Sequence, residues 1–371
     1  MGKWACTLEN MVAKCFNDVF KGRNILVTGH TGFKGSWLSL WLSSLGGNVT
    51  GLSLEPNTNP SHWELLKLNS VKEFIGDIRD KDFVSKVLES SHPEIIFHLA
   101  AQPLVRDSYL DPELTWSTNV IGTLNLLEAS RKLDNLLAIL IVTTDKCYEN
   151  KELNAPYSEK DQLGGYDPYS ASKAAVELLV SSHRRSFHTS KVSPHIASAR
   201  AGNVIGGGDW SKDRLVPDLI RSMSSSNKLV VRYPDSTRPW QHVLDCLSGY
   251  LQLVEKLIME DDFSESWNFG PDINDTATVR DVLDKLQSFW PELNWKLDNI
   301  DNPHEANLLQ LNSLKARSKL GWEQILSLDE SLKMTSDWYS SYLNNKEIIS
   351  VQQLNEYQKL AKKKSANWLN L

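Results

Sequence analysis

Two side chains with the spacing of a proton-transfer pair lie near the middle of the chain. Tyr169 and Lys173, in DPYSASKAAVELLV, are four residues apart, so they share one face of a helix. An ammonium group close to a phenol stabilises the phenolate and lowers its pKa towards neutrality. We therefore predict a base that takes a hydroxyl proton while hydride leaves the same carbon atom.

A second polar group ends an apolar run. In VTTDKCYEN, Thr144 is followed directly by a carboxylate, Asp145, and an ammonium, Lys146. One interpretation is a surface ion pair at a strand end, since exposed pairs are common and weak. What else these residues could do depends on what other elements bring to the same strand end.

A glycine-rich loop, TGHTGFKG, places Gly29, Gly32 and Gly35 between a strand and a helix. Such glycines let the backbone turn tightly and approach a pyrophosphate, which the helix N-terminus then faces. An ordinary tight turn is the alternative, but the strand–turn–helix context favours a dinucleotide site. The predicted cofactor contacts are Gly29, Thr31, Gly32, Phe33, Lys34, Gly35, Ser53, Asp77, Ile78, Ala100, Ala101, Tyr169 and Lys173.

The choice between NAD and NADP depends on the end of the next strand. An acid is expected there to bind the ribose hydroxyls, but Ser53 stands near that place and Glu55 is the nearest carboxylate. Because no arginine for a 2′-phosphate is close in sequence, NAD is favoured. Asp77 and Ile78, in GDIRD, end a further strand and could hold an adenine edge; a helix cap before Lys81 is the alternative.

These residues need a scaffold of alternating strands and helices. Apolar runs predict strands over 24–29, 48–54, 94–101, 136–144 and 195–203. Helical spacing follows in 35–46, 117–133 and 167–180, where Asp167 is the expected N-cap. The pattern predicts an α/β fold, a Rossmann-type doubly wound parallel sheet with helices on both faces. Ligands of such sheets bind beyond the carboxyl ends of the strands.

The composition changes after residue 200, where glycine and charged residues become more frequent. We expect a smaller C-terminal lobe there, with helices near 243–258 and 278–288. The predicted division is an N-terminal extension over 1–20, with Met11 as the natural start, a Rossmann domain over 21–199 plus roughly 239–260, and the smaller lobe over 200–238 and 261–360.

Composition excludes several classes of protein. The 371 residues carry a net charge of -6 without a dense basic block, so nucleic acid is not an expected partner. The four cysteines lack CxxC spacing, which indicates reduced cytoplasmic thiols and neither a disulfide framework nor a metal site. No run approaches the roughly 20 apolar residues of a membrane span. We expect a cytoplasmic protein.

From about Gly22 to Trp322 the chain resembles the extended short-chain dehydrogenase/reductase family. Within it, the chain is similar to the NAD-dependent CDP-D-glucose 4,6-dehydratases, which act in 3,6-dideoxyhexose synthesis for bacterial surface polysaccharides such as O-antigen. Seven segments in the right order carry this resemblance: GHTGFKGSWL, HLAAQPLVRDSY, TTDKCYEN, GGYDPYSASK, RAGNVIGGGDW, RPWQHVL and HEANLLQLN.

The resemblance implies a reaction for these residues, the dehydration of CDP-glucose to CDP-4-keto-6-deoxy-glucose. Tyr169, helped by Thr144 and Lys173, takes the 4-hydroxyl proton as hydride passes from carbon 4 to NAD. Water then leaves across carbons 5 and 6, and the hydride returns to carbon 6. Related dTDP-glucose dehydratases carry Asp-Glu where this chain has Asp145-Lys146. Asp145 therefore matches the acid, and Lys146 stands at the base position.

A lysine acts as a base only where burial or nearby cations hold it partly neutral, and Lys173 would push Lys146 in that direction. A water or Tyr169 is the competing base.

The resemblance also assigns the smaller lobe to nucleotide-sugar binding. The implied substrate contacts are Gln102, Arg106, Asn203, Arg214, Arg238 and His242. Arginines suit a diphosphate because the guanidinium fork donates two hydrogen bonds at once. His98 is expected to be a satisfied core histidine, and Asn119 is either a water-mediated bridge to the active site or an ordinary helix residue. Glu305 has no assigned role, and Asn312 stands where the family usually has Asp.

Two rival functions use the same fold. A nucleotide-sugar 4-epimerase also uses Thr, Tyr, Lys and NAD but needs no acid–base pair after the threonine. A cofactor-sensing regulatory protein commonly loses the tyrosine, which is intact here. Because family members pair through two long helices each, the resemblance implies a homodimer or homotetramer.

Overall fold

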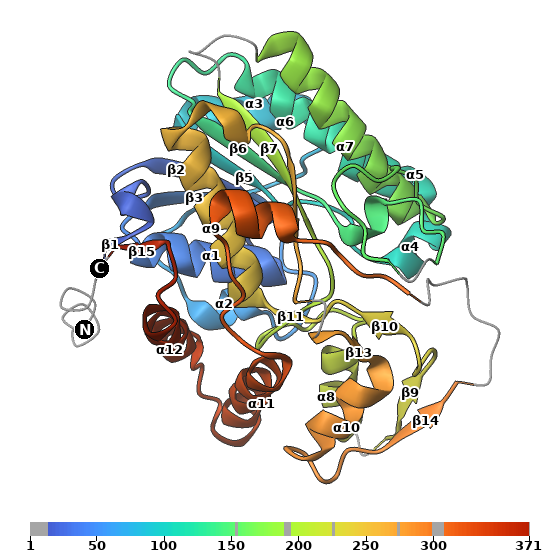
Figure 1. The fold of residues 1–371 in the computed structure, drawn as a ribbon. Coiled ribbons are helices and arrows are strands. Elements are labelled where there is room, and N and C mark those ends of the chain that lie inside the picture. Colours follow the sequence, from blue (N-terminus) through green and yellow to red (C-terminus); the bar gives the residue numbers. More distant parts are fainter. Residues whose placement is uncertain are drawn as a thin grey trace.

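Figure 1 shows the computed structural model, which describes residues 14–152, 155–188, 194–224, 227–272, 275–298 and 308–370. Its centre is a seven-stranded sheet in the order β12-β7-β6-β5-β2-β3-β4. All neighbouring strands in it are parallel. The predicted doubly wound parallel sheet is confirmed. The strands are β2 (Asn24–Thr28), β3 (Asn48–Ser53), β4 (Lys72–Ile75), β5 (Ile95–His98), β6 (Ala138–Val142), β7 (His195–Ala201) and β12 (Ser266–Phe269).

Helices cover both faces of the sheet because alternate strand residues point in opposite directions. In β2, Ile25 and Val27 belong to the core on one face, whereas Leu26 belongs to the core on the other. The first face is covered by α1 (Phe33–Ser44) and α9 (Val243–Met259). The second is covered by α3 (Lys81–Ser91), α6 (Gly122–Ser130) and α7 (Pro168–Phe187).

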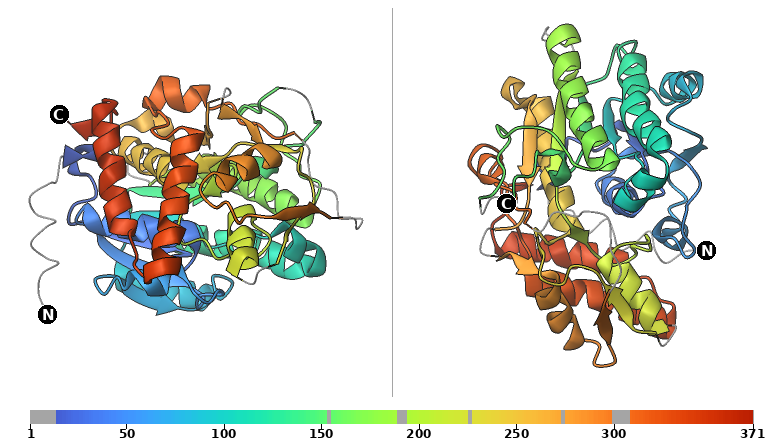
Figure 2. Two further views of the ribbon diagram at one scale, coloured as in Figure 1. Left: turned by 90° about the horizontal axis from the view of Figure 1, so that it is seen from below. Right: turned by 90° about the vertical axis from the view of Figure 1, so that its right-hand side faces the viewer.

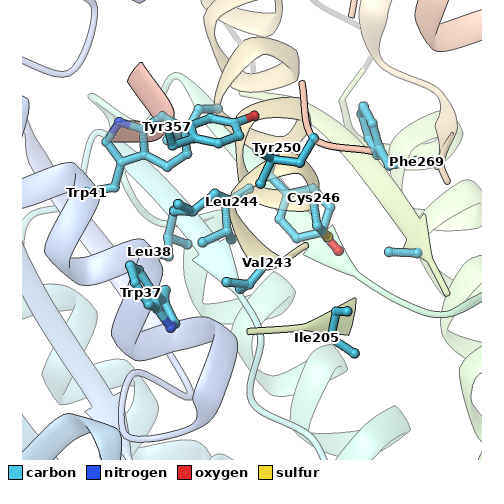
Figure 3. Packing of buried hydrophobic residues seen from close by; sticks show 14 of the residues in the cluster. Trp37, Leu38, Trp41, Ile205, Val243, Leu244, Cys246, Tyr250, Phe269 and Tyr357 are labelled. Atoms are coloured by element: carbon cyan, nitrogen blue, oxygen red, sulfur yellow. The ribbon is translucent and has the colours of Figure 1, made fainter. Parts of the chain in front are cut away.

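Figure 3 shows the core between α1 and α9. Trp37 and Trp41 of α1 and Leu244 and Tyr250 of α9 have no solvent-accessible surface. Tyr357, from α12 (Ser350–Lys363), packs edge-on against Trp41, with ring centroids 5.7 Å apart. The C-terminal helices thus join the core that supports the glycine loop.

The smaller lobe lies beside the sheet (Figures 1 and 2) and is built from short elements. In it, β9 (Leu229–Val231) pairs with β14 (Trp295–Leu297), and β10 (Thr237–Arg238) pairs with β13 (Ala277–Thr278). The pair β8 (Val204–Ile205) and β11 (Gln241–His242) connects it to the sheet. The other helices are α2 (His62–Leu66), α4 (Val105–Leu110), α5 (Pro112–Trp116), a π-helical turn (Ser117–Ile121), α8 (Leu215–Ser224), α10 (Val279–Gln287) and α11 (Leu328–Asn345).

Two segments make contacts outside the part to which the predicted division assigns them. Strand β1 (Lys14–Cys15) pairs with β15 (Leu369–Asn370), and the buried side chains of Phe16 and Phe20 join the core. Residues 1–13 lie outside the described part. At the other boundary, β12 is an edge strand of the main sheet rather than part of the lobe. A four-residue strand that gains its place by pairing with β7 has no periodicity of its own to reveal it.

None of the helices in the described part of the chain combines the length and apolar character needed to cross a bilayer.

Candidate active site

A cleft of about 1090 Å³ lies beyond the carboxyl ends of the parallel strands and extends to the smaller lobe. Residues that directly follow β2, β3, β4, β5, β6 and β7 line it. All predicted cofactor residues line this cleft: Gly29, Thr31, Gly32, Phe33, Lys34, Gly35, Ser53, Asp77, Ile78, Ala100, Ala101, Tyr169 and Lys173.

Each of the three loop positions requires or favours glycine for a different structural reason. Gly29 has φ +74°, and a Cβ there would lie 2.7 Å from the Ala100 nitrogen. A Cβ on Gly35 would collide with the Gly29 carbonyl. A Cβ on Gly32 would meet only the Gly29 oxygen, at 3.3 Å, and would otherwise occupy the cleft. Since Gly32 is also the N-cap of α1 and provides no side-chain cap, this surface fits a pyrophosphate approaching the backbone.

At the end of β3, in the part of the cleft next to the glycine loop, the hydroxyls of Thr31 and Ser53 lie 2.7 Å apart. Although no arginine is close to Ser53 in sequence, the fold brings Arg79 into the lining of the same cleft. Its Nη2 donates to Asp77 Oδ2 at 2.6 Å, and this hydrogen bond lowers the pKa of Asp77. Pairing of β4 with β3 brings GDIRD beside Ser53, a proximity that sequence distance hides.

Tyr169 and Lys173 lie in the first turns of α7, where Asp167 is the N-cap and accepts from the Ser170 nitrogen. Lys173 Nζ donates to the Val142 carbonyl at the end of β6, at 3.1 Å. Burial, and then the charge of Lys34, lowers the pKa of Lys173 to about 8.

The predicted lowering of the Tyr169 pKa is wrong for this structure. Burial raises that pKa to about 12, because a buried phenolate loses its solvation. The charge of Arg214 and a hydrogen bond with Thr144 act in the opposite direction.

The end of β6 brings Thr144, Asp145 and Lys146 to the same cleft as Tyr169. Thr144 Oγ1 donates to Asp145 Oδ1 at 3.0 Å. Asp145 is 1% exposed, and its Oδ2 has no hydrogen-bond partner among the described residues. The lining of the cleft thus includes a buried carboxyl group with one oxygen that no described group satisfies.

Lys146 differs from its predicted environment. Its side chain is 31% exposed, and its Nζ lies 3.9 Å from Asp145 Oδ1. Lys146 is thus partly exposed and close to a carboxylate, whereas a lysine that acts as a base was expected to need burial or a neighbouring cation to keep its amine neutral.

Arginines dominate the other half of the cleft. Of the predicted substrate contacts, Arg106, Asn203, Arg214 and Arg238 line it. Arg106 Nη1 is paired with Asp213 at 3.0 Å. Sequence inspection missed Arg232, whose Nη1 lies 3.8 Å from Asp213. Its position immediately after the apolar strand β9 was the available signal.

Two predicted substrate contacts do not line the cleft. Gln102 is engaged within the protein, donating to the Thr115 hydroxyl at 2.8 Å and accepting from the Leu104 nitrogen at 2.6 Å. His242 is fully buried, and its Nδ1 accepts from the Leu244 nitrogen as the N-cap of α9. Both motifs therefore serve packing and capping in this structure.

The remaining residues of interest have clear positions. His98 is a satisfied core histidine, with Nδ1 2.7 Å from the Thr28 hydroxyl and Nε2 2.9 Å from the Thr123 hydroxyl. Asn119 hydrogen-bonds directly to the Gln102 backbone and to the Ser172 hydroxyl. Asn312 accepts from the Leu314 nitrogen at 2.9 Å. Glu305 lies outside the described residues.

Known proteins share this architecture over most of its length. The chain is 45% identical over 349 residues to the CDP-glucose 4,6-dehydratase of Salmonella typhimurium, covering 92% of this chain and 97% of that protein. Among solved structures, it is similar to the Bacillus cereus UDP-glucuronic acid 4-epimerase in complex with UDP-glucuronic acid and NAD (TM-score 0.74, 25% identity, 85% and 99% covered).

The dTDP-glucose 4,6-dehydratase of Streptomyces venezuelae, solved with NAD bound, has a similar fold (TM-score 0.74, 22% identity, 87% and 97% covered). A model of the GDP-mannose 4,6 dehydratase family matches residues 26–335. The chain therefore belongs to the GDP-mannose 4,6 dehydratase family.

Proposed function

We propose that this protein is an NAD-dependent CDP-glucose 4,6-dehydratase that forms CDP-4-keto-6-deoxy-D-glucose. The observation that carries the reaction type is Asp145, a buried acid with one oxygen left without a hydrogen-bond partner among the described residues, next to Thr144 in the same cleft as Tyr169. An epimerase needs no such acid. The choice of CDP-glucose is supported by the 45% identity to the Salmonella enzyme.

The protein's residues divide the proton transfers. Tyr169, hydrogen-bonded to Thr144, takes the proton of the sugar 4-hydroxyl. A bound NAD would be held by the glycine loop and the Thr31 and Ser53 hydroxyls, and it would supply the hydride chemistry at carbons 4 and 6. Asp145 delivers a proton to the departing 6-hydroxyl. Against burial, which raises the pKa of Tyr169, the charge of Arg214 and the hydrogen bond with Thr144 act to lower it and so favour the phenolate that this step needs. Lys173, held on the Val142 carbonyl, is proposed to add to this support.

Several features of the cleft support NAD as the cofactor. The backbone at Gly32 is accessible where a pyrophosphate would lie, and the Ser53 and Thr31 hydroxyls mark the ribose end. Arg79, which follows the strand paired with β3, is already paired with Asp77, which favours a ribose without a 2′-phosphate.

Lys146 is the proposed base that takes the carbon-5 proton as water is lost and returns a proton to carbon 5 as hydride reaches carbon 6, with a water or Tyr169 as the competitor. Its position in the cleft supports this role, and its exposure and carboxylate neighbour weigh against it. Lys146→Ala should abolish exchange of the carbon-5 hydrogen with solvent deuterium. Near-normal exchange would assign that proton to another group.

We also propose a homodimer or homotetramer formed through the helices in 117–130 and 170–185. Exposed apolar side chains on and next to these helices support this, among them Tyr109, Leu110, Leu114, Trp116, Ile121 and Leu178. A cytoplasmic location is proposed because the described cysteines, Cys15, Cys147 and Cys246, are buried free thiols. The product would supply 3,6-dideoxyhexose synthesis for surface polysaccharides.

The test is a nucleotide-sugar panel. Purified protein with NAD is incubated with CDP-, dTDP-, UDP- and GDP-hexoses in separate reactions. The masses of the products are measured by mass spectrometry. We expect the loss of one water from CDP-glucose. Loss of water from dTDP-glucose but not from CDP-glucose would contradict the assignment of CDP-glucose as the substrate. A product isomer of unchanged mass would indicate an epimerase.

A further inference from the structure

A buried ion pair lies behind the loop that carries Thr144, Asp145 and Lys146. Arg200 Nη2 donates to Glu177 Oε2 at 2.8 Å, and both side chains are at most 3% exposed. Arg200 is on β7 and Glu177 is on α7. The reaction proposed above does not use either residue.

Glu177 gathers hydroxyl groups from three strand segments. It accepts from Thr143 Oγ1 at the end of β6 (2.5 Å), from Ser198 of β7 (2.7 Å) and from Ser266 of β12 (3.0 Å). Burial works against the carboxylate, but the charge of Arg200 and these hydrogen bonds outweigh it, so the pKa of Glu177 is lowered. The group therefore stays ionised, and its hydrogen bonds are charge-assisted.

Arg200 holds the other end of the same loop. Its Nη1 donates to the Tyr148 hydroxyl at 2.7 Å, and its guanidinium carbon lies 5.0 Å from the centre of that ring. The Tyr148 hydroxyl in turn donates to Asn268 Oδ1 at 2.7 Å. Thr143 and Tyr148 directly bracket the catalytic loop 144–147, so one ion pair restrains both of its ends.

The pair also connects the loop to the catalytic helix. Glu177 is four residues after Lys173 and eight after Tyr169, so the three side chains share one face of α7. A buried ion pair is not by itself a net gain in stability, because desolvation offsets the attraction. Because the Glu177–Arg200 pair contacts both ends of the loop, it also fixes the position of the loop relative to α7.

We propose that Glu177 and Arg200 are positioning residues that fix the catalytic loop 144–147 against Tyr169 and Lys173. This inference rests on the proposed function, because it concerns the geometry of that reaction.

Asp245 offers a matched control. It is also a fully buried carboxylate, but it accepts from the Ile325 and Leu326 nitrogens and the Tyr357 hydroxyl on the C-terminal segment. Glu177→Gln and Asp245→Asn each replace one buried, hydrogen-bonded carboxyl group by an amide of the same shape; burial raises the pKa of Asp245 to about 7, whereas the pKa of Glu177 is lowered. Both variants should lower the melting temperature, but only Glu177→Gln should disturb the catalytic loop.

The first experiment compares these variants with the wild-type protein. In Glu177→Gln, kcat should fall by about 100-fold, as for misplacement of catalytic groups by about 1 Å, while KM changes by less than about threefold. Hydrogen–deuterium exchange in peptides covering 143–150 should accelerate in the ligand-free protein. Asp245→Asn should show neither effect. A Glu177→Gln variant with wild-type kcat and unchanged exchange at 143–150 would overturn the proposal.

A second pair keeps the test valid if Glu177→Gln does not fold. Thr143→Val removes the hydroxyl that donates to Glu177, whereas Thr143→Ser retains it. We expect Thr143→Val to lower kcat and Thr143→Ser to restore it. Equal kcat in the two variants would contradict positioning through Glu177.

The outcomes separate this inference from the proposed function. If the wild-type protein does not dehydrate CDP-glucose, the proposed function fails, but the exchange comparison still tests the restraint of the loop. If the wild-type protein is active and all variants have the same kcat, the function stands and the positioning role fails.

Discussion

The two halves of the cleft are built from different parts of the polypeptide. The half around Gly29–Gly35 presents mainly backbone and short side chains at the tips of strands and at the start of α1. The half beside the smaller lobe presents long cationic side chains, among them Arg214, Arg232 and Arg238, from segments with short elements. One half offers a backbone surface, and the other offers charge.

This difference has consequences for binding and for chemistry. A backbone surface is shaped by the fold, so its tolerance for substitution depends on the space at each Cα position. Arginine side chains bind through charge-assisted hydrogen bonds, so their loss weakens binding with little change of fold. Tyr169 and Asp145 lie in the same cleft and are expected to act only in the reaction itself.

The largest effect is expected at Tyr169. Tyr169→Phe removes the proton acceptor, so kcat should fall by about 1000-fold, within the range of general base catalysis. Binding of NAD and of CDP-glucose, measured by calorimetry, should remain close to wild type because neither half of the cleft is altered. Substantial residual turnover would mean that another group takes the 4-hydroxyl proton.

A pair of glycine substitutions sharpens the account of the cofactor half. Gly35→Ala forces a Cβ into the Gly29 carbonyl and should destabilise the fold by roughly 1–3 kcal/mol, seen as a lower melting temperature. In Gly32→Ala the Cβ mainly enters the cleft, so the melting temperature should hold while NAD binding weakens by about tenfold, or 1.4 kcal/mol. Wild-type NAD affinity in Gly32→Ala would refute the pyrophosphate assignment.

A smaller effect is expected in the charged half. Arg238→Ala should raise KM for CDP-glucose by roughly 10- to 100-fold, the loss of charge-assisted hydrogen bonds worth about 1.5–3 kcal/mol. Turnover should change far less. Arg280→Ala, on the same lobe but paired with Asp235 outside the cleft, is the control and should leave KM unchanged. If kcat in Arg238→Ala fell by the same factor as KM rose, a binding role would be contradicted.

The same contrast explains how far the sequence could predict the site. Glycine spacing and apolar runs are local, so the cofactor loop, the strands and the Asp167 cap of α7 were all predictable. The position of Arg232 in the cleft depends on how the smaller lobe packs, and the approach of Arg79 to Ser53 depends on the pairing of β3 with β4.

Burial was also beyond the reach of the sequence. Spacing suggested an acidic Tyr169, but the depth of its pocket raises the pKa. His242 lies in a motif that resembles a substrate loop, yet the fold uses it to cap α9.

The central claim is that the protein, with NAD, oxidises carbon 4 of the sugar and that the same hydride returns to carbon 6 as water is lost. It is tested most directly by incubating the protein and NAD with CDP-glucose that carries deuterium on carbon 4. The account predicts a product lighter by one water, with deuterium on carbon 6. A product of unchanged mass, or a dehydrated product without deuterium on carbon 6, would contradict it.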